Sequence, residues 1–255
     1  MLEQHLSVMK TAFVTGASSG IGQATARALA AAGFQLVIAG RRQERLDELV
    51  AELAPVPVHT LTFDVRDRAA VEAAVAGLPE AFGHIDVLIN NAGNAHGLSP
   101  IQDGDVADWD AMLDGNVKGL LYVSRAVLPR MNQGGFIVNI GSIAGHEAYA
   151  NGNVYCASKA AVSMLTRTMR LDLLPRGIRV AEVAPGMVET EFSNVRFKGD
   201  QTKADNVYKG VQPLRAEDIA DIIQFMVTRP PHVQIAEVIV FPDAQAAAAT
   251  VRRDA

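Results

Sequence analysis

The sequence is poor in cysteine, in aromatic residues and in long apolar or basic runs. It holds one cysteine, Cys156, among 255 residues, which excludes an internal disulfide framework and suits a reducing compartment. No apolar run approaches the roughly 20 residues that a membrane-spanning helix needs. The first ten residues, MLEQHLSVMK, lack the basic start and apolar core of a secretory signal. We therefore expect a cytoplasmic protein in which Cys156 is packed in the interior.

The net charge is also small, and this indicates which kinds of binding partner to expect. The net charge is −5 and no long basic segment occurs, which argues against nucleic acid or a membrane surface as the main partner and favours a small molecule. His59, His84, His96 and His232 show no ligand spacing with cysteine or acidic residues, so we expect no catalytic metal.

Short β-branched runs alternate with helical segments along the whole chain, a pattern typical of parallel strands joined by crossover helices. The expected strands are Thr11–Thr15, Gln35–Ala39, Val58–Thr62, Val87–Asn90, Phe136–Ile140, Arg179–Val183 and Val238–Phe241. The expected helices are Ile21–Ala32, Gln43–Leu53, Arg68–Leu78, Trp109–Met131, Val154–Leu174 and Ala216–Val227. No linker divides this series, so residues 1–255 are predicted to form one α/β domain. Its core would be a Rossmann-type, doubly wound parallel sheet of about seven strands in the order 3-2-1-4-5-6-7, with helices on both faces.

One long segment, Pro185 to Pro213, has no clear period and interrupts the rhythm of strands and helices. Long irregular segments in compact domains are commonly lids or binding loops. Residues 186–213 are therefore expected to form a lid over a binding site within the domain.

The first expected strand runs into the glycine-rich segment TGASSGIG, residues 15–22, and a helix follows at once. Gly16, Gly20 and Gly22 allow a tight turn and a close approach of the backbone to a pyrophosphate, while the helix N-terminus offers free N–H groups to phosphate. An ordinary glycine-rich turn is the alternative. The position of the segment at the first crossover favours dinucleotide binding.

The end of the second strand indicates which dinucleotide. Sites for NAD usually place an acidic residue there to bind the ribose 2′-hydroxyl, but this chain reads AGRR at residues 39–42. Arg41, with Arg42 and the hydroxyl of Ser18 or Ser19, can hold a 2′-phosphate through charge-assisted hydrogen bonds. We predict NADP (NADPH) rather than NAD. The alternative is a solvated arginine pair that opens the next helix.

Residues 155–159 read YCASK, and in a helix they would place Tyr155 and Lys159 on one face. A free tyrosine has a pKa of about 10, and an ammonium at about 4 Å would lower it by about three units at an effective dielectric of 20. Such a pair can exchange a substrate proton near neutral pH. Ser142, just past the fifth strand, can bond the same substrate oxygen. Taken singly, the pair can be an exposed polar edge and the serine a helix cap.

Six motifs then occur in a recognisable order: TGASSGIG, NNAG at 90–93, Asn116 in GNVKG, Ser142 in IGSIAG, YCASK, and PGMVET at 185–190. With this spacing the sequence resembles the short-chain dehydrogenase/reductase family over essentially its whole length. The resemblance implies that Tyr155 is the general acid/base and that Lys159 lowers the pKa of Tyr155 and holds the nicotinamide ribose. It also implies that Ser142 orients the carbonyl group and that Asn116 positions a water for a proton relay.

The same resemblance implies a set of cofactor contacts and a homotetramer formed through the helices at 109–131 and 154–174. The implied cofactor-binding residues are Gly16, Ser18, Ser19, Gly20, Ile21, Gly22, Arg41, Arg42, Asp64, Val65, Asn91, Ala92, Gly93, Tyr155, Lys159, Pro185, Gly186, Val188 and Thr190.

The segments RRQERL at 41–46, ETEFSNVRFKGD at 189–200 and NVYK at 206–209 look like the NADP-dependent 3-hydroxy acid dehydrogenases of this family. That resemblance implies oxidation of serine, allo-threonine or 3-hydroxypropionate-type acids, or the reverse reduction. Arg196 or Lys198 can supply a cation for the substrate carboxylate when the lid closes, or can simply solvate the loop. His146 and Glu147 either line the pocket or belong to a surface turn.

Three alternatives to this substrate class stay open at the level of sequence. Two lie within the same family, a broad carbonyl or ketone reductase and a 3-oxoacyl thioester reductase. The third is a sensor that binds NADPH without catalysis.

Overall fold

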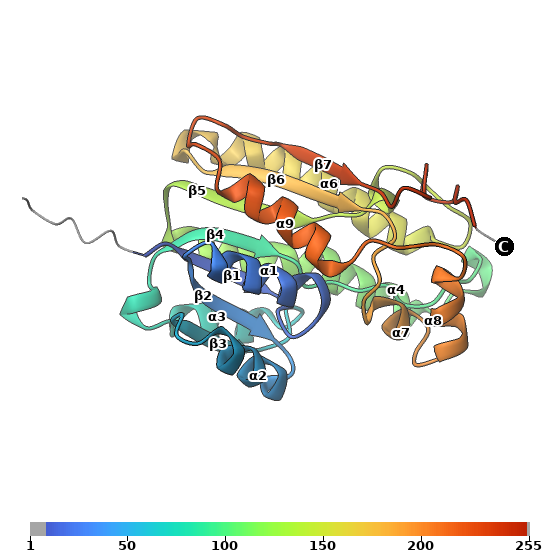
Figure 1. Ribbon diagram of the computed structural model, residues 1–255, viewed down its shortest axis with the longest axis horizontal. Coiled ribbons are helices and arrows are strands. Elements are labelled where there is room, and N and C mark those ends of the chain that lie inside the picture. Colours follow the sequence, from blue (N-terminus) through green and yellow to red (C-terminus); the bar gives the residue numbers. More distant parts are fainter. Residues whose placement is uncertain (1–8, 254–255) are drawn as a thin grey trace, which may run out of the picture.

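The computed structural model of the protein describes residues 9–253 (Figure 1). Seven strands in this range form one parallel sheet in the order β3-β2-β1-β4-β5-β6-β7, which confirms the predicted architecture. The strands are β1 Thr11–Thr15, β2 Gln35–Gly40, β3 Val58–Thr62, β4 Ile85–Asn90, β5 Met131–Ile140, β6 Arg179–Pro185 and β7 Glu237–Val240. The helices are α1 Gly20–Ala31, α2 Gln43–Leu53, α3 Arg68–Ala76, α4 Val106–Leu113, α5 Gly119–Val127, α6 Asn153–Leu173, α7 Phe192–Arg196, α8 Gln201–Tyr208 and α9 Ala216–Val227.

Helices cover both faces of the sheet because its central strands are apolar on both sides. Successive side chains of a strand point to opposite faces. In β1, Ala12 and Val14 pack under α1, α2 and α9, whereas Phe13 packs on the other side under α3, α5 and α6. All three side chains are fully buried. Figure 1 shows α1 and α9 lying side by side over the first of these faces.

The direction of strand addition reverses at the centre of the sheet. β1 pairs with β2 on one side and with β4 on the other, so successive crossovers leave the two sides of β1 in opposite directions. Such a switch point opens a crevice at the carboxyl ends of the strands, where doubly wound sheets bind their ligands.

The predicted helix Trp109–Met131 is wrong in its continuity. α4 ends at Leu113, a π-helical turn covers Asp114–Lys118, and α5 follows from Gly119 to Val127 before β5 begins at Met131. A π-helical turn adds a residue to the helix repeat and is frequent at functional sites. Hydrophobic periodicity cannot reveal it, because the apolar stripe resumes after the inserted residue.

The segment expected to be irregular, residues 186–213, contains two short helices. α7 has five residues and α8 has eight, and isolated helices of that length are marginal in water. Tertiary contacts hold them: the Tyr208 hydroxyl donates to the Val188 carbonyl over 2.8 Å and lies 2.8 Å from the Ser193 hydroxyl. Figure 1 shows α7 and α8 next to each other at one end of the sheet.

None of the helices within residues 9–253 has both the length and the apolar character that crossing a bilayer requires.

Candidate active site

A cavity of about 880 Å³ opens at the carboxyl ends of the strands. Its walls come from the turn between β1 and α1, from the ends of β2, β4, β5 and β6, from the start of α6, and from the segment with α7 and α8. Every residue predicted to bind a cofactor lies on this cavity except Gly22, which is packed beneath its floor.

The glycine turn is held so closely that side chains would not fit. A Cβ on Gly22 would lie 2.3 Å from the Gly16 carbonyl oxygen, and a Cβ on Gly16 would lie 2.6 Å from the Asn91 amide nitrogen. Gly16 also has a φ of 66°, which favours glycine. The turn therefore brings backbone N–H groups of the α1 N-terminus to the cavity, as a phosphate-binding turn requires.

Asn91 supports this turn rather than simply lining the site. Its side-chain amide donates to the Thr15 carbonyl over 2.9 Å, and the Thr15 hydroxyl accepts from the backbone N–H groups of Asn91 and Ala92 at 3.0 Å each. The NNAG motif thus fastens the end of β4 to the end of β1.

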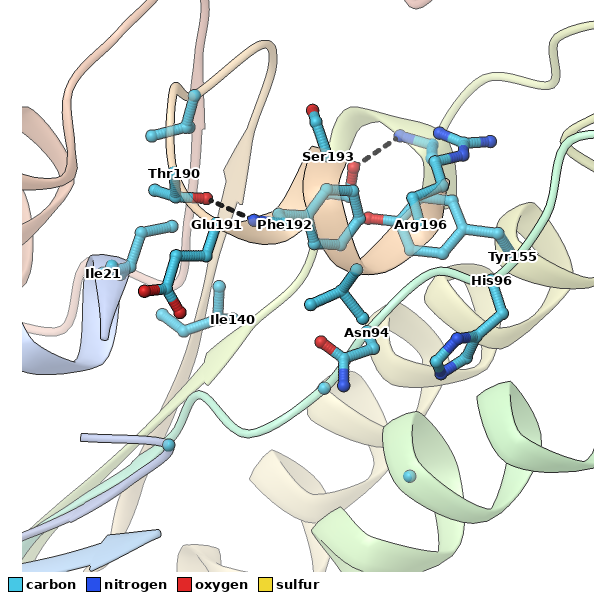
Figure 2. A pocket seen from close by; sticks show the side chains of 18 of the residues that line it. Ile21, Asn94, His96, Ile140, Tyr155, Thr190, Glu191, Phe192, Ser193 and Arg196 are labelled. Carbon is cyan, nitrogen blue, oxygen red and sulfur yellow. Dashed lines mark hydrogen bonds between the residues drawn. The ribbon is translucent and has the colours of Figure 1, made fainter. Parts of the chain in front are cut away.

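Arg41 and Arg42 both stand at the mouth of the cavity beyond β2. Arg41 is largely exposed and its Nη1 lies 3.9 Å from an oxygen of Asp64. Arg42 forms an ion pair of 2.9 Å with Glu191 and donates to the Ser18 carbonyl. Figure 2 shows the Glu191 carboxylate pointing into the cavity.

Arg66, which the sequence did not single out, holds the Asp64 carboxylate. Its guanidinium donates to both carboxylate oxygens, to Oδ1 at 3.0 Å and to Oδ2 at 2.6 Å. This hydrogen bonding keeps the pKa of Asp64 below its ordinary value. An Asp-x-Arg spacing after a strand is the signal that was available for this pair.

Tyr155 and Lys159 lie one turn apart on α6 and are both buried, with exposed fractions of 8% and 7%. Lys159 Nζ lies 6.0 Å from the centre of the Tyr155 ring and donates to the Ile140 carbonyl over 2.9 Å. Both residues line the cavity. The predicted placement of the two side chains on one side of one helix is therefore confirmed.

The sequence predicted that Lys159 lowers the pKa of Tyr155, and this is wrong for the surroundings that the chain itself provides, in which the pKa of Tyr155 is raised. Burial raises the pKa of the Tyr155 phenol, while a hydrogen bond with Ser142 and the positive charge of Arg196 oppose the rise only in part. Burial also lowers the pKa of Lys159 to about 8. Desolvation wins because neither charged form is exposed to water. Tyr155 is thus a neutral phenol, the form that donates a proton.

Ser142 and Asn116 complete the set predicted from the motifs. The Ser142 hydroxyl accepts from the Ala144 backbone N–H over 3.1 Å and is nine-tenths buried. Asn116 sits in the π-helical turn, where its amide accepts from the Asn94 N–H over 2.8 Å and donates to the Asn94 carbonyl and to Ser158 at 2.8 and 3.0 Å. These bonds fix the Asn116 amide beside the α6 segment that carries Tyr155.

Arg196 is brought directly to Tyr155. Its guanidinium carbon lies 5.5 Å from the centre of the Tyr155 ring, and it donates to the Tyr149 hydroxyl over 3.0 Å and to the Gly97 carbonyl over 3.3 Å. Figure 2 shows Arg196 and Phe192 facing Tyr155 across the cavity. Among residues 9–253, no carboxylate lies within ion-pair distance of Arg196.

Three other residues predicted to bind substrate have other partners. Lys198 is ion-paired with Asp108 at 2.9 Å and with Asp105 at 3.4 Å, so its charge is already balanced. His146 and Glu147 do not line the cavity. The Glu147 carboxylate accepts from the Ala248 N–H near the C-terminus, and His146 lies between two glutamates beneath the sheet edge.

Tyr149, Phe192 and His96 are cavity residues that sequence reasoning missed. Each comes from a different loop or short helix, and no periodic spacing connects them. Groups of three or more residues able to hold a metal ion are absent from the part of the chain between residues 9 and 253.

The chain is similar to several known proteins. The family model described as short chain dehydrogenase matches residues 10–201. Sulfoacetaldehyde reductase 2 of Chromohalobacter salexigens is 49% identical over 246 residues, which cover 94% of this chain and 98% of the relative. The NADP-dependent 3-hydroxy acid dehydrogenase of Schizosaccharomyces pombe is 46% identical over 250 residues, 96% of each chain.

A solved structure agrees with these relatives. The closed form of serine dehydrogenase complexed with NADP+ superposes with a TM-score of 0.90 at 44% identity, covering 96% of this chain and 100% of that one. The matched motifs, the parallel sheet and the shared length therefore show that this chain belongs to the short-chain dehydrogenase family of oxidoreductases.

Proposed function

We propose that this chain is an NADP-dependent oxidoreductase that interconverts a small 3-hydroxy acid, of the serine, allo-threonine or 3-hydroxypropionate type, and its 3-oxo acid. The observation that carries the proposal is the Arg196 guanidinium, which lies 5.5 Å from the Tyr155 ring in the cavity and has no carboxylate partner among residues 9–253. A cation beside a proton donor suits a short substrate that bears an anion and a carbonyl group. The 3-hydroxy acid dehydrogenase and serine dehydrogenase relatives support the same class.

A sulfonate in place of the carboxylate is the second candidate. The reason is the 49% identity with a sulfoacetaldehyde reductase over nearly the whole chain. A sulfonate and a carboxylate both accept hydrogen bonds from a guanidinium, so Arg196 can bind either.

The cavity fits NADP by the shape and charge of its own residues. Gly16 and Gly22 are packed so closely against Asn91 and against each other that no Cβ fits, which gives the tight turn that a pyrophosphate-binding backbone needs. Arg41 and Arg42 line the cavity beyond β2, and Arg41, which lies 3.9 Å from Asp64 while Arg42 is paired with Glu191 at 2.9 Å, would be the main cation for a 2′-phosphate. Asn91 to Gly93, Asp64 and Val65 would bind the adenosine side, and Pro185 to Thr190 the carboxamide. When bound, the reduced cofactor supplies the hydride.

The proton in the reduction comes from Tyr155. Its neutral phenol donates to the substrate oxygen as that oxygen gains charge, and Ser142 bonds the same oxygen. Lys159 keeps a positive charge beside the phenolate that Tyr155 becomes, and Asn116 holds a water through which the proton is restored. In the oxidation, the same groups take the hydroxyl proton in reverse.

A substrate panel tests the proposed class. We expect NADPH-dependent reduction of malonic semialdehyde or sulfoacetaldehyde, and NADP-dependent oxidation of serine and 3-hydroxyisobutyrate, with kcat/KM at least about 100-fold above that for a bulky aryl ketone or an acetoacetyl thioester, because the guanidinium contact is worth about 3 kcal/mol. NADPH absorbance gives the rates. A faster rate with the ketone or the thioester would identify the chain as a broad carbonyl or thioester reductase. If no substrate is turned over, the remaining alternative is a sensor that binds NADPH without catalysis.

A charge reversal tests the cofactor. Arg41→Asp is expected to raise the KM for NADPH by about 100-fold and to reverse the preference for NADPH over NADH, because a carboxylate repels the 2′-phosphate and accepts from a 2′-hydroxyl. Arg45→Asp is the matched control, since Arg45 is an exposed arginine four residues later on α2 that pairs only with Glu48. If NADPH preference survives in Arg41→Asp, the assignment of Arg41 is wrong.

A further inference from the structure

Glu182 is a buried carboxylic acid that none of the steps above uses. It lies in β6 with an exposed fraction of 1%, on the face that packs against α6. The Ser163 hydroxyl donates to its Oε1 over 2.7 Å, and His146 Nε2 lies 3.5 Å from the same oxygen. Oε2 has no hydrogen-bond partner among the described residues. A buried carboxyl group with an unsatisfied oxygen is costly, so a role that offsets this cost is expected.

The carboxyl group touches the backbone that carries Ser142. A Cβ on Gly141 would lie 1.8 Å from Glu182 Oε1, so only glycine allows this approach. Gly141 stands between Ile140, whose carbonyl accepts from Lys159 Nζ, and Ser142. Glu182 therefore packs against the link between these two parts of the candidate catalytic set.

The other end of the same turn is held by α6. A Cβ on Gly145 would lie 2.6 Å from the Lys159 carbonyl oxygen and 3.1 Å from the Ser163 hydroxyl. Residues 141–145 are thus clamped between α6 on one side and the Glu182 carboxyl group on the other. Ser163 takes part on both sides, because its hydroxyl packs against Gly145 and also donates to Glu182.

The charged groups around Glu182 come from three elements. Lys159 lies on α6, His146 follows the turn, and Glu237 on β7 lies 3.6 Å from His146 and is paired with Arg167. Burial raises the pKa of Glu182, while Ser163, His146 and Lys159 oppose the rise and Glu237 adds to it. The negative charge of Glu182 in turn opposes the fall in the pKa of Lys159. Each of these two groups favours the charged form of the other.

We propose that Glu182 is a positioning residue for proton transfer: its carboxyl group, which accepts from Ser163 and packs against Gly141, holds the turn that carries Ser142 against the α6 segment of Lys159. This proposal rests on the proposed function, since it concerns the same proton transfer. It explains why the chain keeps glycine at 141 and 145, where any side chain would separate the turn from the carboxyl group or from α6.

The pH dependence of Glu182→Gln tests the proposal, because this change keeps the shape and removes the charge. In the unmodified protein, kcat/KM for reduction should fall as the pH rises through about 8, where Lys159 loses its proton. Removing a nearby negative charge lowers the pKa of both an ammonium and a phenol. In Glu182→Gln the fall of kcat/KM at high pH, the alkaline limb of the pH profile, should therefore move to lower pH by about one unit. The NADPH dissociation constant should stay unchanged.

Glu237→Gln is the matched control. It removes an equal charge from the opposite side of His146, from a residue whose ion pairs are with His146 and Arg167, and should leave the alkaline limb in place. Glu182→Asp keeps the charge on a shorter arm, so it should keep the limb and lower kcat. A wild-type profile in Glu182→Gln, or an equal shift in Glu237→Gln, would overturn the proposal.

Two further measurements keep the test decisive. If Glu182→Gln does not fold, Glu182→Asp tests the proposal instead. A wild-type kcat and a wild-type pH profile in Glu182→Asp would show that the placement of the carboxyl group does not matter, and would overturn the proposal. Turnover by the unmodified protein and its loss in Tyr155→Phe test the proposed function separately, so a failure of one proposal is distinguishable from a failure of the other.

Discussion

Tyr155→Phe is expected to lower kcat at least about 1000-fold in both directions while NADPH still binds, because general acid–base catalysis contributes about 100- to 10,000-fold. The change removes only the hydroxyl group. The ring keeps its contact with Phe192, 5.7 Å between centres, so the fold and the cavity should persist. Stopped-flow or steady-state NADPH absorbance gives kcat, and NADPH fluorescence gives the dissociation constant.

Tyr149→Phe is the matched control for that experiment. It removes a half-buried phenol hydroxyl group from the same cavity, one that accepts from Arg196 at 3.0 Å. Its loss should cost about 10- to 100-fold in kcat/KM, the value of one hydrogen bond to a charged group, and so less than the loss in Tyr155→Phe. Equal losses in the two variants would mean that Tyr155 acts through packing, and unchanged turnover in Tyr155→Phe would refute its role as the acid.

The parts of the site that the sequence predicted are those set by local geometry. The glycine turn and the Tyr-x-x-x-Lys pair each lie within eight residues of chain, and their arrangement follows from the turn and from the helix repeat. The sheet order follows from the alternation of strands and helices, because right-handed crossovers leave few topologies. For these elements, the local sequence pattern is enough to determine the arrangement of the residues in space.

The parts that the sequence did not predict depend on contacts between distant segments. His146 follows Ser142 by four residues, and the sequence allowed it either to line the pocket or to belong to a surface turn; it turns instead toward Glu182 and Glu237, which lie on two later strands. The pKa of Tyr155 was expected to fall because only its neighbour Lys159 was visible in the chain. Burial, which the sequence does not show, has the larger effect and the opposite sign.

Arg196 and Lys198 show the same limit on a smaller scale. Both were candidates for a substrate cation, and the chain gave no reason to prefer one. The structure separates them through α4, because Asp105 and Asp108 neutralise Lys198, whereas within residues 9–253 the Arg196 guanidinium contacts a carbonyl and two tyrosines and no carboxylate. A cation with no carboxylate partner and a place in the cavity is the one able to bind an external anion.

Arg196→Met is therefore expected to lower kcat/KM for malonic semialdehyde or sulfoacetaldehyde by about 100-fold, because a charge-assisted hydrogen bond between a guanidinium and an anion is worth about 1.5 to 3 kcal/mol and such contacts are often paired. Methionine keeps an unbranched apolar stem over the Tyr155 ring. For propanal, a neutral aldehyde of similar size, the change should be small, since no anion is lost. The ratio of the two values of kcat/KM, measured by NADPH absorbance, isolates the anion contact from any general damage to the site.

Lys198→Met is the matched control, because Lys198 is two residues away on the same segment but already ion-paired. It should leave the preference for the anionic aldehyde unchanged. An equal loss with the neutral and the anionic aldehyde in Arg196→Met would mean that Arg196 only supports the segment through Tyr149 and Gly97, and a selective loss in Lys198→Met would move the anion site to that residue. The loss confined to Arg196 and to anionic substrates is the result that the unpaired guanidinium beside Tyr155 requires.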